Sequence, residues 1–220
     1  MTITNFTMRW ATRSVRPAAI AGLALAALGA SACGSSTARE GRSPSYPIIV
    51  KLEGANGAEG ASPKFSTSAV SSDVITFIKS TNSFSVFTDP GRVTIRGAMR
   101  DVTNPNDPTA NNVLTFRRYR VVYRRSDGRN TPGVDVPYPF DGAVTFSVAP
   151  ESETEAGFQL VRVQAKEEAP LRQLTTGGSP ASSISTLAEV TFYGEDQGGR
   201  EVSVTGMISV NFANWGDPDL

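Results

Sequence analysis

From Tyr46 onward, apolar and polar side chains alternate with a period of two, and Gly, Pro, Asn or Asp interrupts the pattern about every ten residues. This alternation predicts β-strands, because successive side chains of a strand point to opposite faces. No window of about 12 residues carries the apolar stripe of a helix. We therefore expect about eight or nine strands with no helix between them, which predicts an all-β chain folded as one antiparallel β-sandwich with long loops.

The clearest pair of expected strands is the last one, a hairpin across the turn 195–200. There Ala188, Val190 and Phe192 are predicted to face the core, and Ser203 and Thr205 to face solvent. In the longest expected strand, Val113, Tyr119, Val121 and Tyr123 are predicted to share one face. A split into two domains near 101–112 is the alternative, but residues 46–100 carry few apolar side chains for a core of their own. The expected strands are 46–52, 74–78, 84–87, 92–100, 113–125, 143–148, 158–165, 187–194 and 201–212.

The N-terminal segment has a different composition. Residues 1–33 contain three arginines and no acidic residue, and the last arginine is followed by an apolar run over 18–28. This run is shorter than the roughly 20 residues that a membrane-spanning helix needs, so it fits the apolar part of a secretory signal. Small residues at 29–32 lead to Cys33, the only cysteine of the chain.

The sequence Ala30-Ser31-Ala32-Cys33 resembles the processing site of bacterial lipoproteins. That family prefers Leu three residues before the cysteine, where this chain has Ala30. The resemblance implies that residues 1–32 are removed and that Cys33 becomes a lipidated N-terminus, which anchors the protein stably in a membrane. Gly34, in place of Asp after the cysteine, implies the outer membrane by the family's sorting pattern. The alternative is an ordinary secretory signal that is cut near Ala32.

Residues 33–45 contain almost no apolar side chains after the cysteine, so they cannot offset the entropy lost on ordering. We expect a flexible, disordered tether that reaches roughly 20 Å as a random coil. The chain is thus predicted to comprise a signal peptide (1–32), the lipidated cysteine with its tether (33–45) and a single β-sandwich domain (46–220).

Two stretches resemble immunoglobulin-like domains. Residues 116–128 are similar to the third strand of a fibronectin type III domain, and the hairpin 188–210 is similar to the closing hairpin of bacterial immunoglobulin-like repeats. The resemblance implies an immunoglobulin-like sandwich, although this chain is about twice as long as a minimal repeat of about 100 residues.

The composition excludes several classes of function. The chain has no histidine, which excludes a Ser-His-Asp triad, a Cys-His pair and any His-ligated zinc. Its single cysteine excludes an intramolecular disulfide, and its net charge of zero removes the usual electrostatic basis for nucleic-acid binding. Neither a Gly-x-Ser-x-Gly elbow nor a phosphate-binding glycine loop is present. We expect no enzymatic activity, no metal and no cofactor.

The most distinctive segment for binding is 126–142, which is rich in proline and glycine. Tyr138 and Phe140 are candidates for a rigid ledge that contacts a sugar ring or a partner side chain, with Asp135 and Asp141 as polar contacts. The alternative is that both aromatic residues plug the open end of the sandwich.

Other polar and aromatic features have two interpretations each. Trp215 either latches the C-terminus onto the domain or stacks on a ligand. Arginines 117–125 form either an anion-binding surface or a solvated sheet face that pairs with acidic residues across strands. The segment 166–168 is expected to be a solvated strand end. Six carboxylates either bind calcium or form turns by bonding their own backbone; they belong to Asp127, Asp135, Asp141, Glu195, Asp196 and Glu201.

Together these features predict a lipid-anchored cell-envelope protein whose β-sandwich is a non-enzymatic binding or structural module. Its expected partners are the membrane, through Cys33, and an envelope protein or a polysaccharide. One alternative is a glycan-active enzyme that uses a pair of carboxylates. Another is a subunit of a surface assembly that pairs a free strand edge with its partner.

Overall fold

The computed structural model describes residues 41–60, 62–101, 110–175 and 183–216. The expected signal peptide, Cys33 and the tether up to residue 40 lie outside these residues. The end of the expected tether is wrong, because Ser43 is buried and Ser45 begins the first strand and donates a hydrogen bond of 2.8 Å to the Asn112 carbonyl. Within the described ranges, no helix combines the length and the apolar character needed to cross a membrane.

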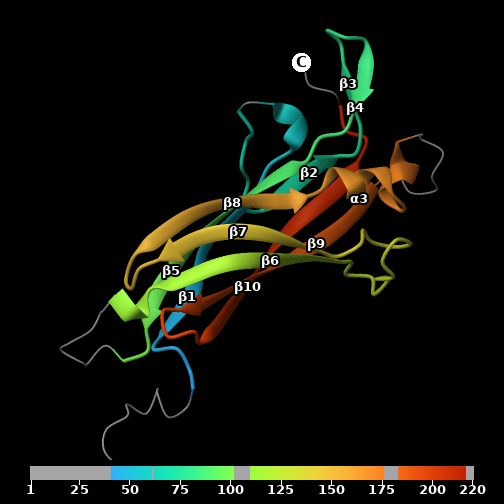
Figure 1. Ribbon diagram of the computed structural model, residues 1–220. Helices are drawn as coiled ribbons and strands as arrows, with labels where there is room; N and C mark the ends of the chain where they lie inside the picture. Colours follow the sequence, from blue (N-terminus) through green and yellow to red (C-terminus); the bar gives the residue numbers. More distant parts are fainter. Residues whose placement is uncertain (1–40, 61, 102–109, 176–182, 217–220) are drawn as a thin grey trace, which may run out of the picture.

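The protein is all-β, as predicted, and its strands form three sheets (Figure 1). The strands are β1 (Ser45–Gly54), β2 (Ala69–Asp73), β3 (Thr76–Ile78), β4 (Ser83–Ser85), β5 (Asp89–Met99), β6 (Leu114–Arg124), β7 (Phe140–Val148), β8 (Glu153–Val161), β9 (Ser183–Asp196) and β10 (Glu201–Ala213). One sheet has the order β1-β5-β8 and is antiparallel. The second has the order β2-β10-β9-β6-β7 and is antiparallel except for the pair β2–β10. Strands β3 and β4 form a separate hairpin.

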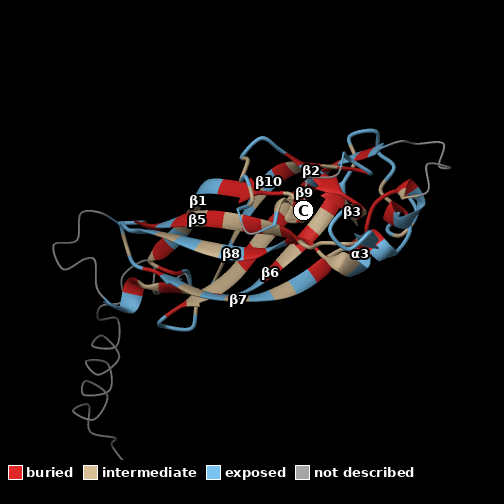
Figure 2. Ribbon diagram, turned by 90° about the horizontal axis from the view of Figure 1, so that it is seen from above, coloured by how far each residue is buried: buried red, intermediate tan, exposed pale blue. Residues whose placement is uncertain are grey.

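The core lies between the three-stranded and the five-stranded sheet. The Phe158 ring of β8 meets the Phe192 ring of β9 edge to face, with centroids 5.3 Å apart. The buried Tyr123 hydroxyl of β6, in the five-stranded sheet, donates a hydrogen bond of 2.6 Å to the Leu160 carbonyl of β8, in the three-stranded sheet. Figure 2 shows how buried residues follow the strands of both layers. These contacts join the two sheets face to face in a sandwich-like arrangement.

The hairpin of β9 and β10 forms as predicted, with the predicted faces. Phe192 pairs with Val204 and Ala188 pairs with Ile208 across the hairpin. Ala188 and Phe192 are buried, whereas Ser203 on β10 is exposed. The strict period of two along both strands explains why the sequence alone predicts this pair.

The predicted faces of β6 are wrong in its first part. The pairing of β6 with both neighbours shifts by one residue between Phe116 and Arg118, which marks a β-bulge. A shift of one residue in a strand moves the side chains on one side of the bulge to the opposite face of the sheet. Leu114 and Phe116 are therefore buried instead of Val113, and the expected alternation holds only from Tyr119 onward.

The expected absence of helices is also wrong. After β8 the chain forms the α-helix α3 (Val163–Glu167), in a place where a strand to residue 165 was expected. A helix of five residues is too short to display a periodic apolar stripe in the sequence. Short 3₁₀ helices lie elsewhere in the described chain, namely η2 (Gly57–Glu59), η3 (Ala110–Asn112) and η4 (Leu171–Leu174).

The turn between β9 and β10 is organised by the carboxylate of Asp196. It accepts hydrogen bonds from the N–H groups of Gly198 at 2.8 Å and Arg200 at 2.9 Å, and from the Arg200 guanidinium at 3.3 Å. Burial raises the pKa of Asp196, but the bonds from Arg200, Ser43 and Gly198 outweigh it and hold that pKa below its ordinary value.

We expect Asp196→Asn to lower the free energy of unfolding by about 1–2 kcal/mol at pH 7, because charge-assisted hydrogen bonds are lost. A carboxyl with a lowered folded-state pKa stabilises the fold above its unfolded-state pKa, and this contribution disappears as the pH falls through the folded-state value. Urea unfolding of wild type and variant should therefore converge in acid. Glu195→Gln is the control, since Glu195 forms an exposed ion pair with Arg117. A deficit that stays constant down to the acid end of the series would contradict this role.

Candidate functional site

Two segments meet at one end of the sandwich. One is the loop 126–139 between β6 and β7, and the other is the α3–η4 segment after β8 (Figure 1). Both views place this end opposite to the end where β1 begins (Figures 1 and 2). A ligand at this end would therefore be far from the point where the chain enters the sandwich.

A hollow of about 800 Å³ lies between these segments. Tyr138 lines it from the loop, and a group of polar side chains lines it from the other segment: Glu167, Glu168, Arg172, Gln173 and Thr175. A second hollow of about 510 Å³ shares four of these residues, so the two adjoin along α3–η4. The site thus combines one aromatic ring with a polar wall.

Tyr138 is held in place by its own loop. Its side chain is 52% exposed, and it stands between Pro137 and Pro139. Gly133 lies against it with a φ of +76°, and a Cβ at this position would come within 2.3 Å of the Tyr138 hydroxyl oxygen. The absence of a side chain at Gly133 therefore leaves room for the Tyr138 ring, and Pro137 and Pro139 restrict the backbone of the loop.

The other three candidates from this segment do not line the hollow. Phe140 is buried with 4% exposure, its ring packed edge-on against Tyr119, so the predicted ledge contains only Tyr138. Asp135 accepts hydrogen bonds from Arg129 Nε at 3.1 Å and from the Thr131 N–H at 3.2 Å. Asp135 therefore stabilises the loop 126–139 through contacts with residues of the same loop.

Asp141 lies on the exposed face of β7, where it forms ion pairs with Arg118 at 3.1 Å and Arg120 at 2.9 Å. Two further arginines of β6 pair with acidic residues across the sheet, Arg117 with Glu195 and Arg124 with Glu189. This geometry matches a solvated sheet face in which opposite charges pair across strands. Among the described residues, no group of three or more metal-binding side chains comes together.

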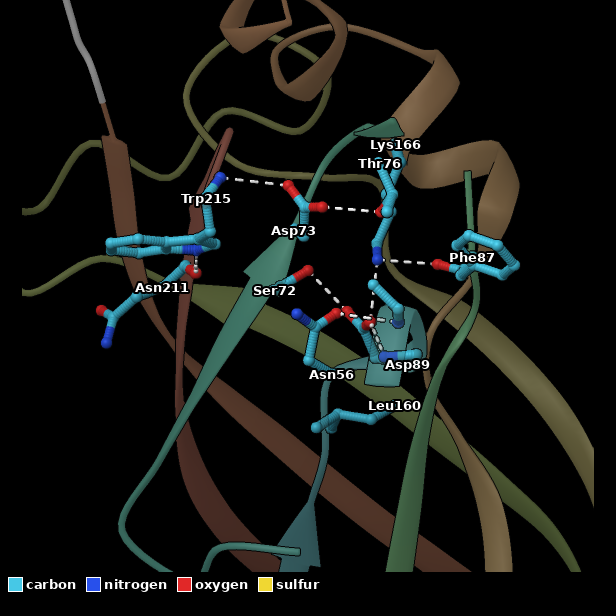
Figure 3. A network of polar contacts seen from close by, with 12 residues as sticks. Asn56, Ser72, Asp73, Thr76, Phe87, Asp89, Leu160, Lys166, Asn211 and Trp215 are labelled. Atoms are coloured by element: carbon cyan, nitrogen blue, oxygen red, sulfur yellow. Dashed lines mark hydrogen bonds and ion pairs between the residues drawn. The ribbon is translucent and has the colours of Figure 1, made fainter. Parts of the chain in front are cut away.

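Trp215 is attached to the end of β10 and does not line the hollow. Its backbone N–H donates to Asp73 at 3.1 Å, and its indole N–H donates to the Asn211 carbonyl at 3.2 Å (Figure 3). The ring remains 37% exposed. These contacts match the interpretation in which Trp215 latches the chain after its last strand.

Below the polar wall lies a buried ion pair that sequence reasoning missed. Lys166 of α3 donates to Asp89 at 2.8 Å and to the Phe87 carbonyl at 2.7 Å, and both charged side chains have an exposed fraction of 0% (Figure 3). The expected solvated strand end at 166–168 is therefore wrong for Lys166. No local signal identifies it, because its neighbours Glu167 and Glu168 are exposed.

The Asp89 carboxylate, at the start of β5, also binds groups of two further segments, β2 and η2. It accepts hydrogen bonds from the Ser72 hydroxyl of β2 and from the Gly57 N–H of η2. Burial raises the pKa of Asp89, and the Lys166 ammonium and the two hydrogen bonds act in the opposite direction. The network ties α3 to the sandwich and fixes the wall of the hollow.

The charged groups of the wall differ in their pairing from the arginines on the outer face of the large sheet. Within the described residues, Glu167, Glu168 and Arg172 form no ion pair. By contrast, a hollow of about 660 Å³ on the outer face of the large sheet contains Arg117 and Arg118, which are both paired. Hence the hollow at Tyr138 has the larger number of charged groups available to a ligand.

The chain matches no protein-family model, no curated protein and no solved structure.

Proposed function

We propose that this protein is a lipid-anchored component of the cell envelope, whose single immunoglobulin-like β-sandwich (46–220) is a non-enzymatic binding module. Residues 1–32 act as the signal peptide, Cys33 carries the lipid in the outer membrane, and the tether between Cys33 and the first ordered residues lifts the domain off the bilayer. The observation that carries the proposal is the hollow at Tyr138, which lies opposite to the start of β1. An anchor at Cys33 would leave this hollow facing away from the membrane.

Binding is favoured over catalysis by the positions of the perturbed carboxyl groups. Burial raises the pKa of Asp73 and Asp89. Both are buried and both already accept hydrogen bonds, Asp73 from Thr76 and Asp89 from Ser72. Neither is placed to exchange a proton with a substrate, as a glycan-active enzyme would require.

Binding in the hollow is also favoured over strand addition at the first strand. The outer strand β1 carries Pro47, a shift in register between Ile49 and Lys51, and an exposed lysine at Lys51. Proline, a bulge and a charged side chain are features that prevent an edge strand from pairing with another chain.

The anchor is tested by metabolic labelling with an alkynyl fatty acid and by membrane fractionation. We expect wild type to carry the label and to sediment with membranes, and Cys33→Ser to lose the label and to become soluble. A Cys33→Ser chain that partitions to membranes as well as wild type would exclude the anchor. The soluble variant then serves for binding measurements, because its sandwich is unchanged.

A further inference from the structure

We propose that the hollow binds an uncharged polysaccharide, with one sugar ring stacked on Tyr138 and its hydroxyl groups bonded to the polar wall. This inference rests on the proposed function and names the class of ligand for the same site.

The aromatic surface suits a sugar ring. Half of the Tyr138 side chain is exposed, while Gly133 and the flanking prolines restrict its movement. A ring that is already ordered loses little conformational entropy when a ligand stacks on it. Tyr also offers an apolar face next to a polar hydroxyl, which matches the mixed surface of a pyranose.

The wall supplies planar polar groups at the rim of the same hollow. The carboxylate of Glu168 and the guanidinium of Arg172 line the hollow, and both lack ion-pair partners among the described residues. Each of these groups has two polar atoms in one plane, so it can bond two adjacent hydroxyl groups. The segment that carries them is fixed by the buried side chains of Leu171 and Leu174 and by Lys166.

The charge of the hollow disfavours an anionic ligand. Glu167 and Glu168 contribute two negative charges, and Arg172 contributes one positive charge. An anionic polymer would place its charges near unpaired carboxylates, which is unfavourable. The hollow of about 800 Å³ lies within the usual size range of ligand sites and can hold a short stretch of a chain.

The test uses envelope fragments of the source organism and the soluble Cys33→Ser chain in a sedimentation assay. One sample of fragments is oxidised with periodate, which cleaves vicinal diols of sugars, and another is digested with proteinase K. We expect binding to survive the protease and to be lost after periodate, and soluble dextran sulfate not to compete. Binding that survives periodate but not the protease would overturn the glycan inference and leave the binding module intact. Absence of binding to untreated fragments would overturn both.

Substitutions in the hollow test whether it is the glycan-binding site. Tyr138→Ala should weaken binding by about tenfold or more, whereas Tyr138→Phe, which keeps the ring, should stay within about threefold of the parent chain. Arg172→Ala should weaken binding as well. The matched control is Tyr46→Ala, which removes an exposed tyrosine of β1 at the other end of the molecule and should leave binding unchanged. Equal affinities for Tyr138→Ala and Tyr46→Ala would rule out this hollow as the glycan site.

Discussion

Replacing Lys166 by methionine is expected to lower the free energy of unfolding by about 3–5 kcal/mol, because the Asp89 carboxylate is left in the interior without its counter-charge. Methionine keeps most of the apolar volume of the lysine stem, so loss of packing is a minor part of the effect. The Phe87 carbonyl also loses its donor. This change should be measured by urea unfolding at neutral pH.

The pH dependence of this deficit separates a charge effect from a packing effect. Burial raises the pKa of Asp89, and removing Lys166 takes away the main interaction that opposes the rise. A carboxyl with a raised folded-state pKa destabilises the fold above that pKa, and the penalty fades as the pH falls towards the unfolded-state value. The deficit of Lys166→Met should therefore shrink in acid, whereas a packing defect would not change.

Two further variants complete the experiment. Adding Asp89→Asn to Lys166→Met should cost less than the sum of the single substitutions, because the two side chains interact directly. Lys64→Met is the control at an exposed lysine and should shift the free energy by about 0.5 kcal/mol or less. A loss below about 1 kcal/mol for Lys166→Met would show that the ion pair contributes little to fixing α3.

The sequence predicts elements whose signal is local and regular. The β9–β10 hairpin is such a case, because an unbroken alternation runs along both strands and a turn-forming segment separates them. On β6 the same reasoning fails at a single position, because the bulge near Arg117 depends on both neighbouring strands and leaves no mark in the residue types. Beyond that position the alternation predicts the buried residues again.

The candidate site was predictable only in part. The proline-rich loop indicates a rigid aromatic residue, and Tyr138 is indeed exposed at the hollow. The sequence does not distinguish Tyr138 from Phe140, because both stand in similar surroundings and only the start of β7 turns Phe140 inward. The Lys166–Asp89 pair joins residues 77 positions apart, and the polar wall of 167–175 meets Tyr138 from another segment, so only the tertiary fold brings these groups together.

The second large effect is expected at Phe192, where the two sheets meet. Its side chain is fully buried, and its ring contacts Phe158 at 5.3 Å, Tyr119 at 6.0 Å and Phe146 at 6.4 Å between centroids. Phe192→Ala removes a large apolar group from all three neighbours and leaves a cavity that the surrounding strands fill only in part. The expected loss of unfolding free energy is about 3–5 kcal/mol.

Tyr193 provides the matched control, since it follows Phe192 on the same strand and points to the opposite face. There it lies under the Arg118 guanidinium, 4.2 Å from the ring centroid, and Tyr193→Ala should cost about 1 kcal/mol or less. Urea unfolding should show a lower midpoint for Phe192→Ala with an unchanged slope, because both sheets then still unfold together. A shallower slope, or a second transition, would mean that the sheets unfold separately and that the ring cluster does not couple them. Similar losses for Phe192→Ala and Tyr193→Ala would contradict the assignment of the inward face, on which the packing of the two layers depends.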